Sequence, residues 1–96
     1  MDKDVQFLAR SDVIVREEGD EGEALLFDPE TERIKVLNRT GLLLWNWCDG
    51  DHSRADLVAA LAGEYPSVDR DLLEADVERF LGDLADLGLV RQVEAA

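Results

Sequence analysis

The feature that most limits how this chain can fold is a change of hydrophobic pattern at Leu37-Asn38. Arg33 to Val36 alternates polar and apolar residues with a period of two, which is typical of a half-buried β-strand, and Leu37 breaks the alternation. From Asn38 onward the apolar residues recur at helical spacing instead. The sequence therefore predicts a strand that runs into a helix with almost no loop between them.

Two further strands are predicted before this junction. Residues 13–15 form a short β-branched run, and residues 24–27 form a second apolar segment. The acidic, glycine-containing stretch at 16–23 separates these two, and an Asp-Pro-Glu-Thr turn at 28–31 leads into the strand at 33–37. Because turns this short join neighbouring antiparallel strands, we expect a meander with the strand at 33–37 on its edge.

The first predicted helix begins at Asn38, whose side chain can accept a hydrogen bond from the backbone N–H of Thr40 or Gly41. Its apolar residues fall on two adjacent stripes, Gly41, Leu44, Trp45 and Cys48 on one and Leu43 and Trp47 on the other. We therefore expect this short helix to be buried on most of its circumference. Gly50 suits the left-handed position just past its end.

Two more helices are predicted downstream. Ser53 and Asp56 have the spacing of a capping box, and the helix that they begin stops at Pro66. Ser67 or Asp69 caps the third helix, in which apolar residues recur at spacings of four and three. These residues are Leu73, Val77, Phe80, Leu84 and Leu87, and Gly88 follows them.

Strand patterns and helix patterns are thus segregated along the chain. This order predicts an α+β fold of the winged helix-turn-helix type, with a three-stranded antiparallel sheet followed by three helices. The mixed charge of residues 1–12 predicts a flexible N-terminal arm, and residues 89–90 predict the start of a short extended tail. A chain of 96 residues has the length of one domain.

Acidic residues outnumber basic ones by 23 to 10, which gives a formal net charge of −13. A field of this sign repels nucleic acid and anionic membrane surfaces, and it favours a basic partner. The longest apolar run, residues 57–62, is much shorter than a membrane span. The charged residues that follow Met1 do not form a signal peptide, so we expect a cytoplasmic protein.

Residues that commonly carry catalysis or bind metals are sparse. His52 is the only histidine and Cys48 the only cysteine, so a zinc site would lack most of its usual ligands. The favoured interpretation is that His52 is an exposed turn residue and that Cys48 is buried as a small apolar residue. Trp45 and Trp47 suggest an aromatic cage, but residues two apart on a helix point to different faces, so core packing is favoured. We therefore expect no catalytic residues, no metal and no cofactor.

The strand before the junction is the basic part of an acidic protein. Residues 31–40 hold three basic residues and one acidic residue, a local net charge of +2, whereas residues 69–87 hold seven acidic and two basic residues, a local net charge of −5. Charged side chains protect a free sheet edge from aggregation, but they also suit an edge that docks a peptide. Composition alone leaves these two interpretations equal.

Seven short motifs follow one another from this junction to the end of the third helix. They are Leu37-Asn38, Trp45, Asp49-Gly50, Ser53, Tyr65-Pro66, Asp76-Val77 and Leu84 to Leu89. In this order they resemble the PqqD-like family, the peptide-recognition elements of pathways that make ribosomally synthesised, post-translationally modified peptides (RiPPs). The resemblance covers residues 10–92, nearly the whole chain.

The resemblance implies a non-catalytic, peptide-binding domain at residues 13–92. Members of the family bind the leader segment of a precursor peptide and present it to a modifying enzyme, often a radical SAM enzyme. The leader adds as a strand to the edge of the third strand and lies against the last helix, a mode called β-augmentation. The residues at the matching positions are Arg33, Ile34, Lys35, Val36 and Leu37 on the strand and Asp76, Arg79, Phe80, Asp83, Leu84 and Leu87 on the helix.

The resemblance therefore favours docking over edge protection for the strand at 33–37. The alternative function is a winged-helix module that binds DNA or associates with the transcription machinery. A recognition helix needs basic residues to meet phosphates, and the best candidate, residues 69–87, has a net charge of −5. We therefore expect a precursor peptide and its modifying enzyme as partners, and neither nucleic acid nor membrane.

Overall fold

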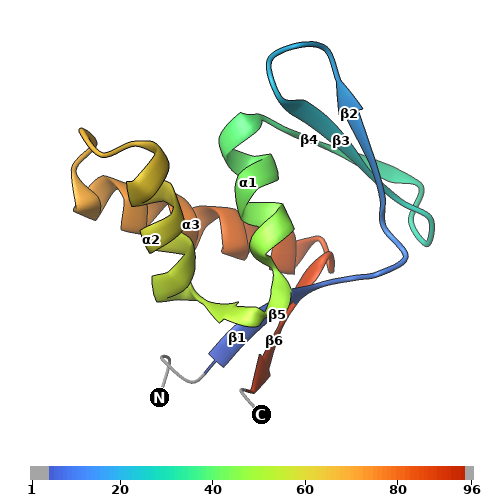
Figure 1. The fold of residues 1–96 in the computed structure, drawn as a ribbon. Helices are drawn as coiled ribbons and strands as arrows, with labels where there is room; N and C mark the ends of the chain where they lie inside the picture. The colour runs from blue at the N-terminus through green and yellow to red at the C-terminus, as the bar shows by residue number, and fades with distance from the viewer. Residues whose placement is uncertain (1–4, 95–96) are drawn as a thin grey trace.

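The computed structural model describes residues 5–94, in which two three-stranded sheets and three helices form an α+β fold (Figure 1). In chain order the elements are β1 (Val5–Ala9), β2 (Ile14–Glu18), β3 (Glu23–Asp28), β4 (Arg33–Leu37), α1 (Arg39–Trp47), β5 (Asp49–Ser53), α2 (Arg54–Glu64), α3 (Arg70–Asp86) and β6 (Val90–Glu94). The strand orders are β5–β1–β6 and β2–β3–β4, and the pairings are antiparallel. In Figure 1 the β2–β3–β4 sheet lies to the upper right of the helices, and β5–β1–β6 lies below them.

The predicted meander is confirmed by the β2–β3–β4 sheet. Its strands pair in sequence order, for example with Phe27 of β3 opposite Ile34 of β4. In the turn between β3 and β4, the backbone N–H of Glu32 donates to the carbonyl oxygen of Asp28 at 2.7 Å. The Asp28 carboxylate also accepts a hydrogen bond from the backbone N–H of Glu30 at 2.9 Å, as expected for an Asp-Pro turn.

The alternating apolar side chains of β4 face solvent, although its period-two pattern suggests that they are buried. Its apolar residues Ile34 and Val36 are 61% and 60% exposed, whereas Leu37 is 3% exposed. The buried side of the sheet comes mainly from β3, where Ala24 and Leu26 pack inward. A period-two pattern establishes that a strand has two unlike faces, but packing against the neighbouring elements decides which face is buried.

The expectation of a flexible arm at residues 1–12 differs from the structure. Residues 5–9 are β1, the central strand of the second sheet, and residues 1–4 lie outside the described residues. Val5 to Ala9 pair along their length with β6, and the side chain of Phe7 is buried in the core. This strand is not predictable from local sequence, because its partners β5 and β6 lie far away along the chain.

Two other segments extend the predicted secondary structure. The polar stretch Asp49–Ser53, expected as a turn, is β5, and the tail expected at residues 89–90 continues as β6. Helix α1 already ends at Trp47, with Cys48 as its C-cap. Gly50 does adopt a left-handed conformation, with a φ of 88°, but it does so inside β5.

Each of the three helices begins at a cap that the sequence predicts. The Asn38 side chain accepts a hydrogen bond from the backbone N–H of Gly41 at 2.8 Å. Ser53 and Asp56 form a reciprocal capping box at the start of α2, and Asp69 caps α3. Among residues 5–94 no helix is long and apolar enough to cross a membrane.

The core lies between the helices and the two sheets. Its least exposed large side chains are Leu26, Leu44, Leu57, Leu61, Val77 and Leu84. Trp45 is 7% exposed, and Trp47 is partly buried against the same cluster. The two tryptophans therefore pack in the core, as the sequence predicts, and do not form a cage wall.

An ionic cluster centred on Arg10 ties the two sheets together. The Arg10 guanidinium donates to both carboxylate oxygens of Asp28 at 3.0 Å, to Asp12 at 2.7 and 3.0 Å and to the carbonyl oxygen of Gly88 at 3.4 Å. It also lies 2.7 Å from Glu30. Because Arg10 follows β1, Asp28 ends β3 and Gly88 follows α3, this cluster fixes the β3–β4 turn beside the end of α3.

Candidate functional site

The exposed edge of the β2–β3–β4 sheet at β4 is the first part of the candidate site. β4 pairs with β3 on one side only, so among the described residues its other backbone edge has no strand partner. Arg33, Lys35 and Leu37 lie on the side of the sheet that faces the core, because they are opposite the inward residues of β3. Ile34 and Val36 lie on the other side. We call the unpaired backbone of Arg33–Leu37 the β4 edge.

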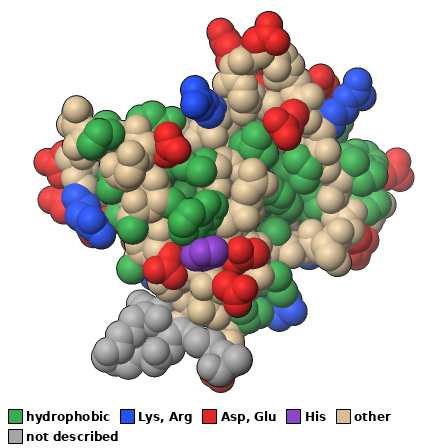
Figure 2. All heavy atoms as spheres, in the orientation of Figure 1, with side chains coloured by type: hydrophobic (Ala, Val, Ile, Leu, Met, Phe, Trp, Pro, Cys, Tyr) green, Lys and Arg blue, Asp and Glu red, His purple; other side chains and the backbone are tan. Residues whose placement is uncertain are grey.

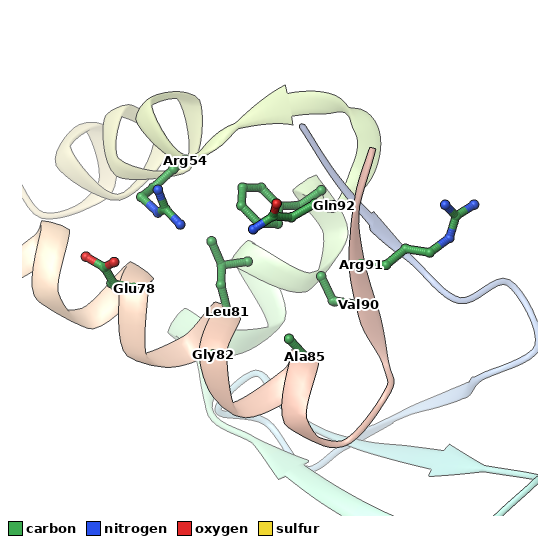
Figure 3. Close-up of a pocket in the computed structure, with 9 residues that line it drawn as sticks. Arg54, Glu78, Leu81, Gly82, Ala85, Val90, Arg91 and Gln92 are labelled. Atoms are coloured by element: carbon green, nitrogen blue, oxygen red, sulfur yellow. The ribbon is translucent and has the colours of Figure 1, made fainter. Parts of the chain in front are cut away.

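The second part is a groove of about 300 Å³ between the start of α1 and α3. Its lining residues are Asn38, Thr40, Gly41 and Leu44 from the α1 side and Asp76, Arg79, Phe80 and Asp83 from α3. We call this hollow the α1–α3 groove. The structure thus brings together four of the six α3 residues that the resemblance implies for peptide binding. Another hollow, between α3 and β6 (Figure 3), contains none of the residues that the sequence predicts for peptide binding.

The strand-to-helix junction explains why the groove opens at this point. Asn38 is the residue directly after β4, and its capping bond to Gly41 turns the chain into α1 at once. Gly41 allows a close approach, because a Cβ there would lie 3.3 Å from Asn38 Oδ1 and from a methyl group of Leu37. The Thr40 and Tyr65 hydroxyl groups are 3.0 Å apart, which links the start of α1 to the end of α2.

The β4 edge and the groove are continuous. At one end of β4, Arg33 pairs with Asp28, which the Arg10 cluster holds beside Gly88 at the end of α3. At the other end, Asn38 lines the groove together with the middle of α3. The two parts of the site therefore meet at Asn38, and a chain that follows the β4 edge toward Asn38 would reach the groove and α3.

The rim of the groove is polar and its floor is apolar. The Arg79 guanidinium donates to Asp76 at 2.9 Å, and both side chains are exposed, so this ion pair adds little to stability and its groups are free to contact a ligand. Asp83 is also exposed, whereas Phe80 is partly buried. An apolar floor with a few polar groups above it is the usual composition of a ligand pocket.

The remaining implied residues lie in other environments. Leu84 is completely buried and Leu37 is 3% exposed, so their side chains belong to the core beneath the site. Leu87 is partly buried against the core. Helical spacing alone could not separate these supporting residues from the groove-lining ones.

The sequence predicts capping or packing roles for Asn38, Gly41 and Leu44, and for Thr40 only a backbone N–H near the cap. All four line the groove. Their position directly after the edge strand could have indicated these four residues. Because α1 begins almost at once, its first turns lie beside the end of the β4 edge.

Cys48 and His52 lie away from the groove and have structural environments. The Cys48 thiol is buried, and burial raises its pKa to about 12. His52 Nδ1 lies 2.8 Å from Asp49 Oδ1, and the His52 ring contacts the Trp47 ring at a centroid distance of 4.3 Å. Among residues 5–94, no three His, Cys, Asp or Glu side chains are gathered in a way that could hold a metal ion.

The comparison with protein families identifies the fold. The model of the family described as coenzyme PQQ synthesis protein D (PqqD) matches residues 23–90. The chain belongs to the PqqD family. The PqqD match runs from the start of β3 to the start of β6, so it contains the β4 edge and the whole α1–α3 groove.

Three solved structures share this PqqD fold. A lasso peptide synthetase B1 complexed with the leader peptide is 28% identical, with a TM-score of 0.74 over 90% of this chain and 98% of that one. TbiB1 in complex with the TbiA(beta) leader peptide is 26% identical, with a TM-score of 0.73 over 88% and 94%. The PqqD truncation of Methylobacterium extorquens PqqCD, described as a stand-alone RiPP recognition element, is 22% identical, with a TM-score of 0.73 over 95% and 93%. No curated protein sequence matches this chain.

Proposed function

We propose that this PqqD-family protein binds the leader segment of a ribosomally made precursor peptide and presents it to a modifying enzyme. The observation that carries the proposal is the continuity of the β4 edge with the α1–α3 groove. Support comes from two proteins of the same fold, 26% and 28% identical, whose structures are described as leader-peptide complexes. The leader would add to the sheet as a strand beside β4.

In this arrangement the backbone and the side chains of the leader have separate tasks. Its N–H and C=O groups would pair with those of the β4 edge, which gives affinity without regard to sequence. Because side chains of a strand alternate between its two faces, every second leader residue would point toward the α1–α3 groove. There Phe80 offers apolar contact, and Arg79 and Asp83 offer charges of opposite sign.

The proposed role is non-catalytic, so the chemistry belongs to a partner. We propose a peptide-modifying enzyme of the radical SAM type as this partner and the cytoplasm as the compartment. The single, buried Cys48 suits a reducing compartment, because it forms no disulfide. A fusion or complex that places the modifying enzyme next to the groove would make a weak leader interaction sufficient.

The DNA-binding alternative has no support from the helix that would have to recognise DNA. All seven acidic residues between 69 and 87 are exposed, and they outnumber the two arginines. A helix of this charge repels phosphates. No specific observation favours that function.

The test is a binding measurement with synthetic precursor peptides, taken from short open reading frames that a search of the neighbouring genes identifies. We expect the leader segment to bind with sub-millimolar affinity by fluorescence anisotropy, and the core segment alone not to bind. Phe80→Ala in the groove should weaken leader binding, whereas Leu72→Ala, which is on α3 but outside the groove lining, should not. No binding of any such peptide, or equal binding of leader and core, would contradict the proposal.

A further inference from the structure

The face of the β2–β3–β4 sheet that points away from the core is apolar over β4 and the neighbouring part of β3, whereas Arg16, Glu18 and Glu23 make it charged toward the β2–β3 loop. Ile14 lies opposite Phe27, which lies opposite Ile34, and Leu25 lies opposite Val36 on the same face. Ile14, Ile34 and Val36 are 57%, 61% and 60% exposed. We call these five apolar residues the outer face, and Figure 2 shows hydrophobic side chains over this sheet at the right of the view.

The charged residues of β4 protect only one of its two faces. Charged side chains protect an edge strand from pairing with a second chain, including charged residues that point inward. On β4 the charged residues Arg33 and Lys35 share the side of buried Leu37, and the solvent side carries the β-branched residues Ile34 and Val36. Two exposed β-branched residues on a free edge strand favour the pairing of a further strand.

A strand added at the β4 edge would place half of its side chains on the outer face. Directly opposite residues in neighbouring strands have Cβ atoms about 5 Å apart, and apolar pairs at this distance stabilise the sheet. The outward side chains of the added strand would therefore contact Ile34 and Val36, while the inward ones enter the α1–α3 groove. The outer face would therefore contact one half of the leader side chains, and the α1–α3 groove would contact the other half.

We propose that the outer face selects leader peptides that carry two apolar, β-branched or aromatic residues two positions apart, which pack on Ile34 and Val36. The inference rests on the proposed function and names the peptide class that the site prefers. The leader is the occupant that the structure favours over a second copy of this chain or an enzyme surface. The reason is that Ile34 and Val36 belong to the same strand as the β4 edge, with the spacing of alternate residues in an added strand.

The test uses an Ile34→Thr, Val36→Thr double variant and an Ile14→Thr control. Threonine is also β-branched, so these changes preserve strand propensity while they remove apolar surface. Ile14 is on the same face and about equally exposed, but it is on β2, and both β3 and β4 lie between it and the added peptide. Thermal unfolding monitored by circular dichroism establishes that all three proteins are folded.

We expect the double variant to bind the synthetic leader about five- to tenfold more weakly, the middle of the range for two cross-strand pairs. We expect Ile14→Thr to bind within about twofold of the unaltered protein. A leader with alanine at its outward positions should lose affinity for the unaltered protein and lose little more in the double variant. Equal leader binding by the double variant, or an equal loss in Ile14→Thr, overturns the inference alone. A change from dimer to monomer in the double variant also overturns it, because the face then serves a second copy. No leader binding by the unaltered protein overturns the proposed function as well.

Discussion

Replacing Asn38 tests the junction on which the site depends. Its side-chain oxygen accepts a 2.8 Å hydrogen bond from the backbone N–H of Gly41, a buried residue in the first turn of α1. Asn38→Ala removes this acceptor and leaves a buried donor without its partner. The loss of an N-cap costs about 1 kcal/mol, within a range of roughly 0.5–2 kcal/mol. For a domain of this size, about 1 kcal/mol lowers the melting temperature by roughly 4–8 °C.

The assay is thermal and urea unfolding of three variants. Asn38→Asp keeps an acceptor at the same position, so its stability should stay close to that of the unaltered protein. Asn46→Ala is a matched control on the same helix, where the side chain is exposed. Alanine has the higher helix propensity, so this variant should be as stable as the unaltered protein or slightly more stable. If Asn38→Ala and Asn46→Ala unfold at the same temperature, the capping account of the junction is wrong.

Three further predictions concern stability and reactivity. Gly82 is an exposed residue within α3, and no atom lies near the position of an added Cβ. Urea unfolding should therefore show that Gly82→Ala raises the free energy of unfolding by about 0.5–1 kcal/mol, while leader binding stays unchanged. No gain in stability would contradict the open space at this site. The hydrogen bond from the Arg10 guanidinium lowers the pKa of Asp28. The ionised Asp28 carboxylate therefore contributes fully to stability above its ordinary pKa of about 4, and this contribution is lost as the pH falls toward the lowered pKa. Urea midpoints between pH 7 and pH 3 should therefore fall more steeply in the unaltered protein than in Asp28→Asn, and parallel curves would exclude this contribution. Burial raises the pKa of Cys48 to about 12. Iodoacetamide at pH 8 should therefore modify the thiol in urea but not in the folded protein. Rapid modification of the folded protein would contradict the burial of Cys48.

Local chemistry made much of the fold predictable. The caps Asn38, Ser53 and Asp69 and the turn at Asp28 each depend on residues within a few positions, so their signals are visible in the sequence. The second sheet was missed for the opposite reason. β1 depends on one partner in the middle of the chain, β5, and on another at its far end, β6. The polar stretch Asp49–Ser53 in turn pairs as a strand with β1.

The candidate site was predictable in part for the same physical reason. The alternation at residues 33–37 identified a strand with two faces, but it could not indicate that Ile34 and Val36 face solvent, since that depends on how β3 packs on the helices. Spacings of three and four along α3 placed Phe80 and Leu84 together, although only Phe80 lines the groove. Burial separates core residues from binding residues on one helix, and burial is a property of the whole fold.

The central claim is that a leader peptide adds to the sheet at the β4 edge. Amide hydrogen exchange, measured residue by residue with and without the synthetic leader, tests it directly. The sheet has a second edge at β2 (Ile14–Glu18), which is an internal control. We predict that alternate amides of Arg33–Leu37, those whose N–H points to the free edge, become protected when the leader binds, while β2 amides keep their exchange rates. Leader binding without new protection in β4, or with protection in β2 instead, would contradict the account.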